Sequence, residues 1–120
     1  MGLFNKSFRT QGIEEVLEEW AATREQNAGR AVMGRLVLTD RRLVFTPNRL
    51  DSAFRGETVA IMLGEVTAVA EEKVASTNSG HLELELRVTV TDGKIERLSV
   101  ADVPRVCAEV QRAVSALHQG

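Results

Sequence analysis

Few residue types in this 120-residue chain could do covalent or metal chemistry. The two histidines, His81 and His118, have no serine, cysteine or carboxylate placed to form an activated nucleophile. The single cysteine, Cys107, lies on an apolar stripe at helical spacing, where a free thiol usually packs as a small hydrophobic group. The chain has no pair of cysteines and no pair of histidines at helical spacing, so it lacks the ligands of a zinc site. We therefore expect no catalytic residue, no metal and no cofactor, and a protein that is not an enzyme.

Arginine is the residue type whose placement is informative. Between Arg24 and Arg55 the chain carries seven basic and three acidic residues, a local excess of +4 in a protein whose net charge is -2. Arginine forms forked hydrogen bonds with phosphate or carboxylate groups, so a loop rimmed by arginines could hold a lipid phosphate or an acidic peptide. Ordinary solubilising surface charge is the alternative. The candidate anion-binding or lipid-binding residues are Arg24, Arg30, Arg35, Arg41 and Arg42.

The elements that must position these arginines are mainly strands, because apolar residues alternate with polar ones after residue 30. A tight turn at Asp40-Arg41 and a second at Asp92-Gly93 join neighbouring strands as hairpins. Since Ile95 falls on the opposite parity to the apolar residues after it, we expect a bulge near the second turn. The strands are predicted at 31–39, 43–46, 59–63, 66–70, 82–90 and 94–100, with polar loops at 48–56 and 71–80.

The last element is predicted to be an amphipathic helix. Asp102 suits its N-cap, and Pro104 suits its first turn, where a missing N–H costs little. An apolar stripe this wide must be buried against another element. The stripe consists of Val103, Val106, Cys107, Val110, Val114 and Leu117.

The segment from Ile13 to Arg24 is ambiguous. Its apolar residues recur at helical spacing, with glutamates on the other face, which taken alone indicates a helix. An extended strand that places Val16, Trp20 and Ala22 on one side is the alternative. With six or seven strands and one helix, the chain is predicted to form a β-sheet or barrel with the helix packed on it.

Composition bounds the class of protein. With 43% hydrophobic and 27% charged residues, the chain is expected to form one domain at 12–120, preceded by an N-terminal arm at 1–11. No stretch is apolar enough to span a membrane, no signal peptide is expected, and one cysteine fits a reducing compartment. The overall charge balance argues against a nucleic-acid partner.

The segment Gly34–Phe45, which reads GRLVLTDRRLVF, resembles the signature hairpin of GRAM domains. In that family a strand ends in Leu-Thr, turns through Asn or Asp, and returns as Arg-Leu-(Val/Ile)-Phe. The order of elements continues the resemblance from about Gly12 to Leu117. It implies a mainly β, pleckstrin-homology-like fold: a seven-stranded antiparallel bent barrel of two packed sheets, capped by a C-terminal α-helix. It also implies that Glu15–Thr23 is the first strand, and we adopt that interpretation.

The barrel pattern and the absence of catalytic groups favour a binding module, and the short chain looks like the bacterial members of the family. We expect a non-catalytic module that acts by protein–protein contact or by contact with an acidic membrane lipid. A structural module that assembles into a homo-oligomer is the alternative, and an enzyme ranks last. The expected location is the cytoplasm, or the periphery of the inner membrane surface. The sequence does not name the partner.

Overall fold

The computed structural model describes residues 14–27, 30–48, 57–75 and 82–119. Within these residues, seven antiparallel strands form one sheet in the order β4-β3-β2-β1-β7-β6-β5, and a helix follows the last strand. The elements are β1 (Val16–Asn27), β2 (Arg30–Thr39), β3 (Arg42–Pro47), β4 (Val59–Met62), the short 3-10 helix η1 (Leu63–Glu65), β5 (Val66–Ala75), β6 (Leu82–Val90), β7 (Ile95–Val100) and α3 (Val103–Gln119). The predicted arm at 1–11, all but the first residue of the predicted loop at 48–56, residues 76–80 of the predicted loop at 71–80, and His81 lie outside the described residues.

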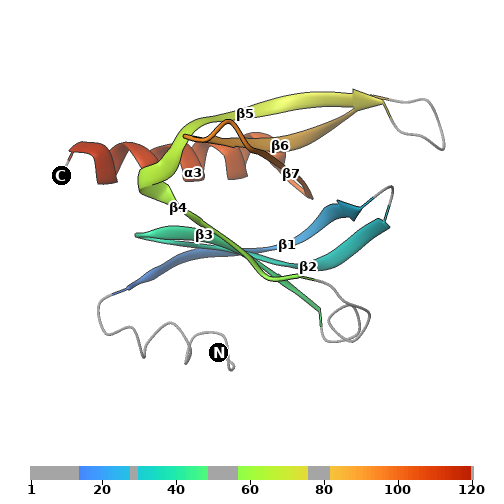
Figure 1. Ribbon diagram of the computed structural model, residues 1–120, viewed down its shortest axis with the longest axis horizontal. Coiled ribbons are helices and arrows are strands. Elements are labelled where there is room, and N and C mark those ends of the chain that lie inside the picture. Colours follow the sequence, from blue (N-terminus) through green and yellow to red (C-terminus); the bar gives the residue numbers. More distant parts are fainter. Residues whose placement is uncertain (1–13, 28–29, 49–56, 76–81, 120) are drawn as a thin grey trace.

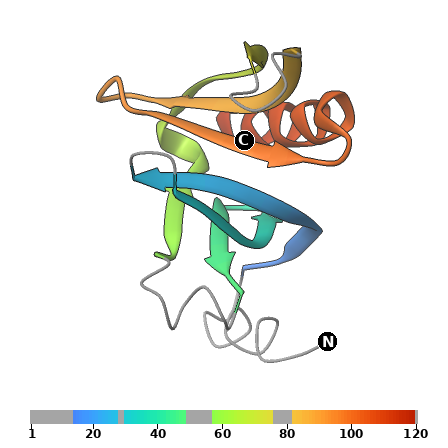
Figure 2. The ribbon, with the colours of Figure 1, turned by 90° about the vertical axis from the view of Figure 1, so that its right-hand side faces the viewer.

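The sheet bends into two layers (Figures 1 and 2). Strands β1 to β4 form one layer, and β5 to β7 form the other. The layers are joined where β1 and β7 pair over three positions only: Ala22 with Val100, Thr23 with Ser99, and Arg24 with Leu98. Helix α3 packs on β5, β6, β7 and η1, so it belongs to the second layer. The expected seven-stranded bent barrel with a C-terminal helix is confirmed.

The core lies between the two layers and against α3. Residues of β2 and β3 that face inward, such as Leu36 and Phe45, meet Leu86 from the opposite layer and Val110 from the helix. The helix begins as predicted, because the Arg105 amide donates to the Asp102 carboxylate at 3.3 Å. The N-terminal part of the predicted apolar stripe is buried as expected, whereas Leu117 at its far end is 41% exposed. No helix in the described ranges is long and apolar enough to cross a bilayer.

The ambiguous N-terminal segment is a strand, as the family resemblance implied. β1 pairs with β2 from Val16 to Asn27, and Trp20 packs against the core. The helical spacing of its apolar residues is overridden by this pairing, since Leu17 is 44% exposed rather than buried.

One prediction for the second layer was wrong and another was confirmed. Residues 71–75 are not loop but the second half of β5, which continues opposite β6 to Ala75. This half of the strand extends past the core, so neither of its faces is buried and its sequence does not need to alternate apolar with polar residues. The bulge expected near the Asp92-Gly93 turn is present in the turn itself, because the Gly93 amide donates to the Val90 carbonyl, the Val90 amide donates to the Lys94 carbonyl, and Gly93 has a positive φ, as in a G1 bulge. Beyond this bulge β6 and β7 pair without a register shift, and Ile95 lies on the exposed face. The turn itself is confirmed, because Gly93 has a φ of 88°.

Gly34 allows β2 and β3 to approach closely. A Cβ atom at this position would collide with the carbonyl oxygen of Thr46 and would lie 2.8 Å from the Cα of Pro47. Any larger residue at position 34 would therefore push β2 and β3 apart.

Candidate functional site

The five candidate arginines do not share one rim of the barrel. Arg24 lies opposite Val32 near one end of the β1–β2 pair, while Thr39 at the other end lies opposite Val16 and leads directly into Arg41 and Arg42. Eight residues of strand separate these ends, which corresponds to roughly 26 Å. Arg30 begins β2, and its side chain lies outside the described part of the chain.

Arg24 is directed into the barrel. Its guanidinium binds the Glu96 carboxylate from β7 with contacts of 2.9 and 3.4 Å, and the two side chains are only 13% and 24% exposed. Leu36, Phe45 and Leu98 surround the pair. Burial of both charges is tolerable because each compensates the other. Arg24 therefore connects the two layers where β1 meets β7.

Arg42 belongs to a buried network at the β2–β3 turn. Its guanidinium makes two hydrogen bonds to the Glu14 carboxylate, at 2.8 and 3.0 Å. The Thr39 hydroxyl lies 2.6 Å from the same carboxylate and accepts the amides of Arg41 and Arg42. Burial would raise the pKa of Glu14, but the hydrogen bonds from Arg42 and Thr39 and the charges of Arg42 and Arg41 outweigh it and hold that pKa below its usual value.

Glu14 is one of the glutamates that the sequence places opposite the apolar residues of this segment, yet its side chain is only 4% exposed. The sequence gives little indication that Glu14 is buried, since no neighbouring residue distinguishes it from Glu15. The partner of Glu14 lies across two strands, and only the register of β1 on β2 brings them together.

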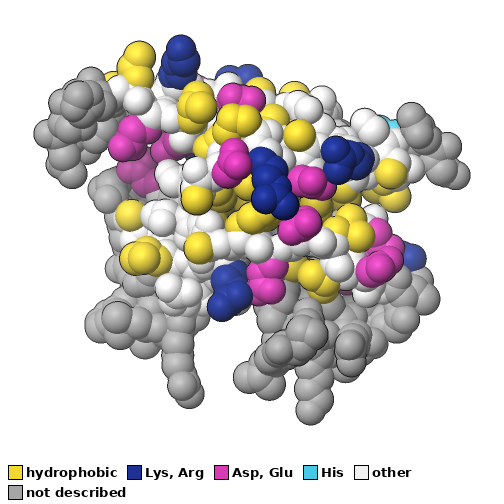
Figure 3. Space-filling view, turned by 180° about the vertical axis from the view of Figure 1, so that it is seen from behind, with side chains coloured by type: hydrophobic (Ala, Val, Ile, Leu, Met, Phe, Trp, Pro, Cys, Tyr) yellow, Lys and Arg dark blue, Asp and Glu magenta, His cyan; other side chains and the backbone are white. Residues whose placement is uncertain are grey.

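The remaining candidates lie on the surface. Arg35 is 63% exposed and binds Glu19 of β1 at 2.8 Å, and Arg41 is exposed at the turn. The local excess of +4 seen in the sequence is thus offset by glutamates that the fold brings in from outside that stretch. Figure 3 shows basic and acidic side chains interspersed on one face of the molecule. Anion binding by these arginines stays a prediction.

A groove lies on the outer face of the sheet beside Arg35. It has a volume of about 430 Å³ and crosses β2, β1 and β7. The strand register explains it. Thr23 lies between Met33 and Ser99 on neighbouring strands, and Ala21 lies beside Arg35. Small side chains at the central positions of this face form a low floor.

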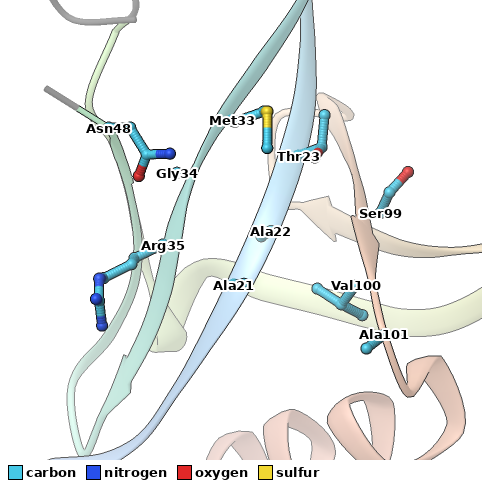
Figure 4. A pocket seen from close by; sticks show the side chains of 10 residues that line it. All are labelled: Ala21, Ala22, Thr23, Met33, Gly34, Arg35, Asn48, Ser99, Val100 and Ala101. Carbon is cyan, nitrogen blue, oxygen red and sulfur yellow. The ribbon is translucent and has the colours of Figure 1, made fainter. Parts of the chain in front are cut away.

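Larger side chains form the walls of the groove (Figure 4). Met33, which is 59% exposed, supplies an apolar thioether, while Arg35 and Asn48 supply a guanidinium and an amide. Thr23 and Ser99 add hydroxyl groups. The described lining contains no histidine, cysteine or carboxylate. Small residues on the outward face of a strand are the one signal of this groove in the sequence, but they do not show which strands adjoin.

The other residues with chemical potential are dispersed. Cys107 is buried in the helix–sheet interface, where burial and then the charge of Glu71 raise the pKa of its thiol. His118 is exposed near the end of α3. Across the ranges that the structure describes, no three histidine, cysteine or acidic side chains are placed to hold a metal ion.

A scan against protein-family models finds no match, and neither does a search of curated proteins. Solved structures do match. The chain is similar to the C-terminal domain of an unknown protein from Leishmania infantum, with a TM-score of 0.73, 15% identity, and coverage of 94% of this chain and 95% of that one. It is also similar to the Vps36 N-terminal PH domain, with a TM-score of 0.65, 12% identity, and coverage of 91% and 85%. The fold is pleckstrin-homology-like.

A further similarity supports the same fold. The hSac2 domain from human phosphoinositide phosphatase Sac2 aligns with a TM-score of 0.71 and 10% identity, covering 96% of this chain and 80% of that one. At such identities the likeness concerns the path of the backbone. The pleckstrin-homology-like fold follows from it, while the binding residues must be argued from this chain's own side chains.

Proposed function

We propose that this protein is a non-catalytic binding module of the GRAM type, which contacts a protein partner through the groove across β2, β1 and β7. The observation that carries the proposal is the groove itself: a low floor of small side chains beside an exposed Met33 and a guanidinium from Arg35. Mixed apolar and polar lining of this kind suits a protein side chain. The pleckstrin-homology-like neighbours support a binding role in general, and the Gly34–Phe45 hairpin supports the GRAM type.

A protein partner is favoured over an acidic membrane by the electrostatics of the described residues. Arg24, Arg35 and Arg42 each bind a glutamate, so they offer little net positive charge to a lipid headgroup. Membrane attraction by basic residues needs several of them together on one surface. A cytoplasmic location is part of this proposal.

The experiment places a photo-crosslinking amino acid at Met33 in the protein expressed in its own cells. We expect an adduct of one defined mass. A control places the same amino acid at Met62, which is similarly exposed but lies on β4, away from the groove. We expect the Met33 adduct to be lost when Thr23→Trp fills the groove floor, and to survive Ile95→Trp on the exposed face of β7.

Equal adducts from both positions, or adducts that Thr23→Trp leaves unchanged, would contradict the groove as the contact surface. Vesicles of neutral and acidic lipids at low salt test the membrane directly. We expect the protein to stay in the supernatant. Sedimentation with acidic vesicles that Arg35→Ala or Arg41→Ala weakens would replace the protein partner with a membrane.

A further inference from the structure

Strand β5 is one edge of the sheet, and the hydrogen bonds of the next hairpin show which of its backbone groups are unpaired. The Val90 amide donates to Lys94 and its carbonyl accepts from Gly93, so the backbone of Val90 is directed away from β5. Backbone direction alternates along a strand. The residues of β6 that are directed toward β5 are therefore Glu83, Glu85, Arg87 and Thr89.

The register between the two strands transfers this alternation to β5. Ala70, Glu72 and Val74 lie opposite Arg87, Glu85 and Glu83, so their amides and carbonyls bond β6. The backbone groups that point outward belong to Val69, Glu71, Lys73 and Ala75. One contact confirms the direction, because the side-chain amide of Gln111 donates to the Val69 carbonyl at 2.8 Å. No described residue bonds the outward groups of the other three.

An edge of this length can accept another strand. In antiparallel pairing, only residues that both point outward can exchange hydrogen bonds, which restricts the possible registers of two β5 strands. A two-fold axis at Glu72 places Glu71 opposite Lys73 of the other copy, twice, and Val69 opposite Ala75. This axis also places Glu72 opposite Glu72, but both of these carboxylates are bound by arginines, whereas axes at Glu71 or Lys73 would place two like charges opposite each other that have no ion-pair partner among the described residues. Opposite charges at facing positions stabilise a pair of strands, and like charges destabilise it.

We propose that two copies of this chain associate by antiparallel pairing of β5 with β5 about a two-fold axis at Glu72. The pairing continues the sheet across both molecules. The pairing gives hydrogen-bond partners to the outward backbone groups of Glu71 and Lys73. It also places each of these two side chains opposite one of the other charge, and neither has an ion-pair partner among the described residues. This association uses a different surface from the groove across β2, β1 and β7, so it is independent of the proposed function.

The surroundings of β5 are compatible with this axis. The two Glu72 side chains would meet on the outer face, but each is already bound by Arg97 at 2.8 Å and lies 4.0 Å from Arg87, which offsets their repulsion. On the other face, Leu84 lies beside Lys73 and is 38% exposed. In the paired sheet, Lys73 would lie between Leu84 and the Glu71 side chain of the other copy.

The proposed pairing also brings Ala75 close to a groove on the other copy. A groove of about 280 Å³ lies between the start of β5 and α3, lined by Val69, Gln111 and Val114 among others. Since Ala75 of one copy lies opposite Val69 of the other, its small methyl group faces this groove. A larger side chain at position 75 would collide with α3 of the other copy.

Sedimentation velocity over a concentration series tests the proposal. We expect the wild-type protein to show a monomer–dimer equilibrium. Glu71→Lys, and separately Lys73→Glu, should weaken the dimer by about 10- to 100-fold, because each replaces two attractive cross-strand pairs with two repulsive ones. Glu83→Lys is the matched control, since Glu83 is an exposed glutamate of β6 away from the edge, and it should leave the equilibrium unchanged.

Variants that restore opposite charges at the facing positions test whether the dimer forms through β5 in this register. The double variant Glu71→Lys/Lys73→Glu should dimerise like the wild type. A mixture of the two single variants should form heterodimers in preference to either homodimer. Circular dichroism establishes that each variant is folded, and the mixture remains informative if one single variant is only marginally stable.

Three outcomes overturn the proposal. A wild-type protein that stays monomeric at every concentration excludes the second copy and leaves the edge to an extended segment of another protein. Equal weakening by Glu83→Lys shows that general charge is responsible. Failure of both the double variant and the mixture to restore the dimer excludes the register about Glu72.

Discussion

Replacing Thr39 with valine removes one buried oxygen atom at almost constant volume. Thr39 is 0% exposed, and its hydroxyl accepts the Arg41 amide at 3.0 Å and the Arg42 amide at 2.9 Å while it lies 2.6 Å from the Glu14 carboxylate. Thr39→Val therefore changes hydrogen bonding at the β2–β3 turn and little else.

The size of the effect follows from these contacts. A hydrogen bond to an ionised group contributes about 1.5–3 kcal/mol, and a neutral one about 1 kcal/mol. Water can replace part of the loss at the Arg41 amide, because Arg41 is exposed. We expect Thr39→Val to lower the free energy of unfolding by about 3 kcal/mol. For a chain of 120 residues this corresponds to a fall in Tm of about 10 °C.

The loss should depend on pH. The pKa of Glu14 is lowered in the folded protein, so its contribution is fully present above the ordinary pKa of a glutamate, about 4.3, and is lost as pH falls through the folded value. Thr39→Val removes one of the hydrogen bonds that lower this pKa. The difference between variant and wild type should therefore be largest above about pH 5 and should shrink in acid.

Urea unfolding at neutral and acid pH, followed by circular dichroism, measures both effects. Thr67→Val is the matched control, since the Thr67 hydroxyl makes a single exposed bond to the Thr89 carbonyl at 3.2 Å, and it should change stability by less than about 0.5 kcal/mol. A Thr39→Val protein as stable as this control, or one equally destabilised at both pH values, would refute the coupling of Thr39 to Glu14.

Three other predictions concern positions elsewhere in the fold. Gly34→Ala should destabilise the protein by about 2 kcal/mol in urea unfolding because its Cβ meets the β3 backbone, whereas Gly64→Ala, whose nearest contact is 3.8 Å away, should be close to neutral. In a double-mutant cycle, Arg24→Met and Glu96→Gln should each cost about 2 kcal/mol, and the double variant should cost clearly less than their sum. A thiol reagent should modify Cys107 far more slowly than a free thiol at pH 8, because the residue is buried and its pKa is raised, and denaturant should remove the protection. Additive losses in the cycle, or rapid labelling of the folded protein, would contradict these accounts.

The elements that the sequence predicted well were those whose local pattern and tertiary role agree. The hairpin from Arg30 to Pro47 combines alternating apolar residues with a turn at Asp40, and both survive in the structure. Helix α3 was predictable from its cap and its stripe. The Asp92-Gly93 turn was predictable because glycine tolerates its φ of 88°.

What the sequence could not predict depends on contacts between distant strands. The second half of β5 looked like a loop because Glu71 to Ala75 extend past the core, where no apolar alternation is required. Arg24 looked like a surface cation because its partner, Glu96, lies 72 residues away. The groove escaped prediction because its floor is assembled from the outer faces of three strands that only the register brings together.

The narrow seam between β1 and β7 has a consequence for how the chain folds. Apart from this seam, every strand pairs with a neighbour in sequence, so β1 to β4 and β5 to β7 are two successive meanders with short loops to close. The three pairs of the seam and the bond from Arg24 to Glu96 close a far longer loop, so we expect them to form after both meanders. Substitutions at the seam should therefore speed unfolding while leaving the folding rate nearly unchanged.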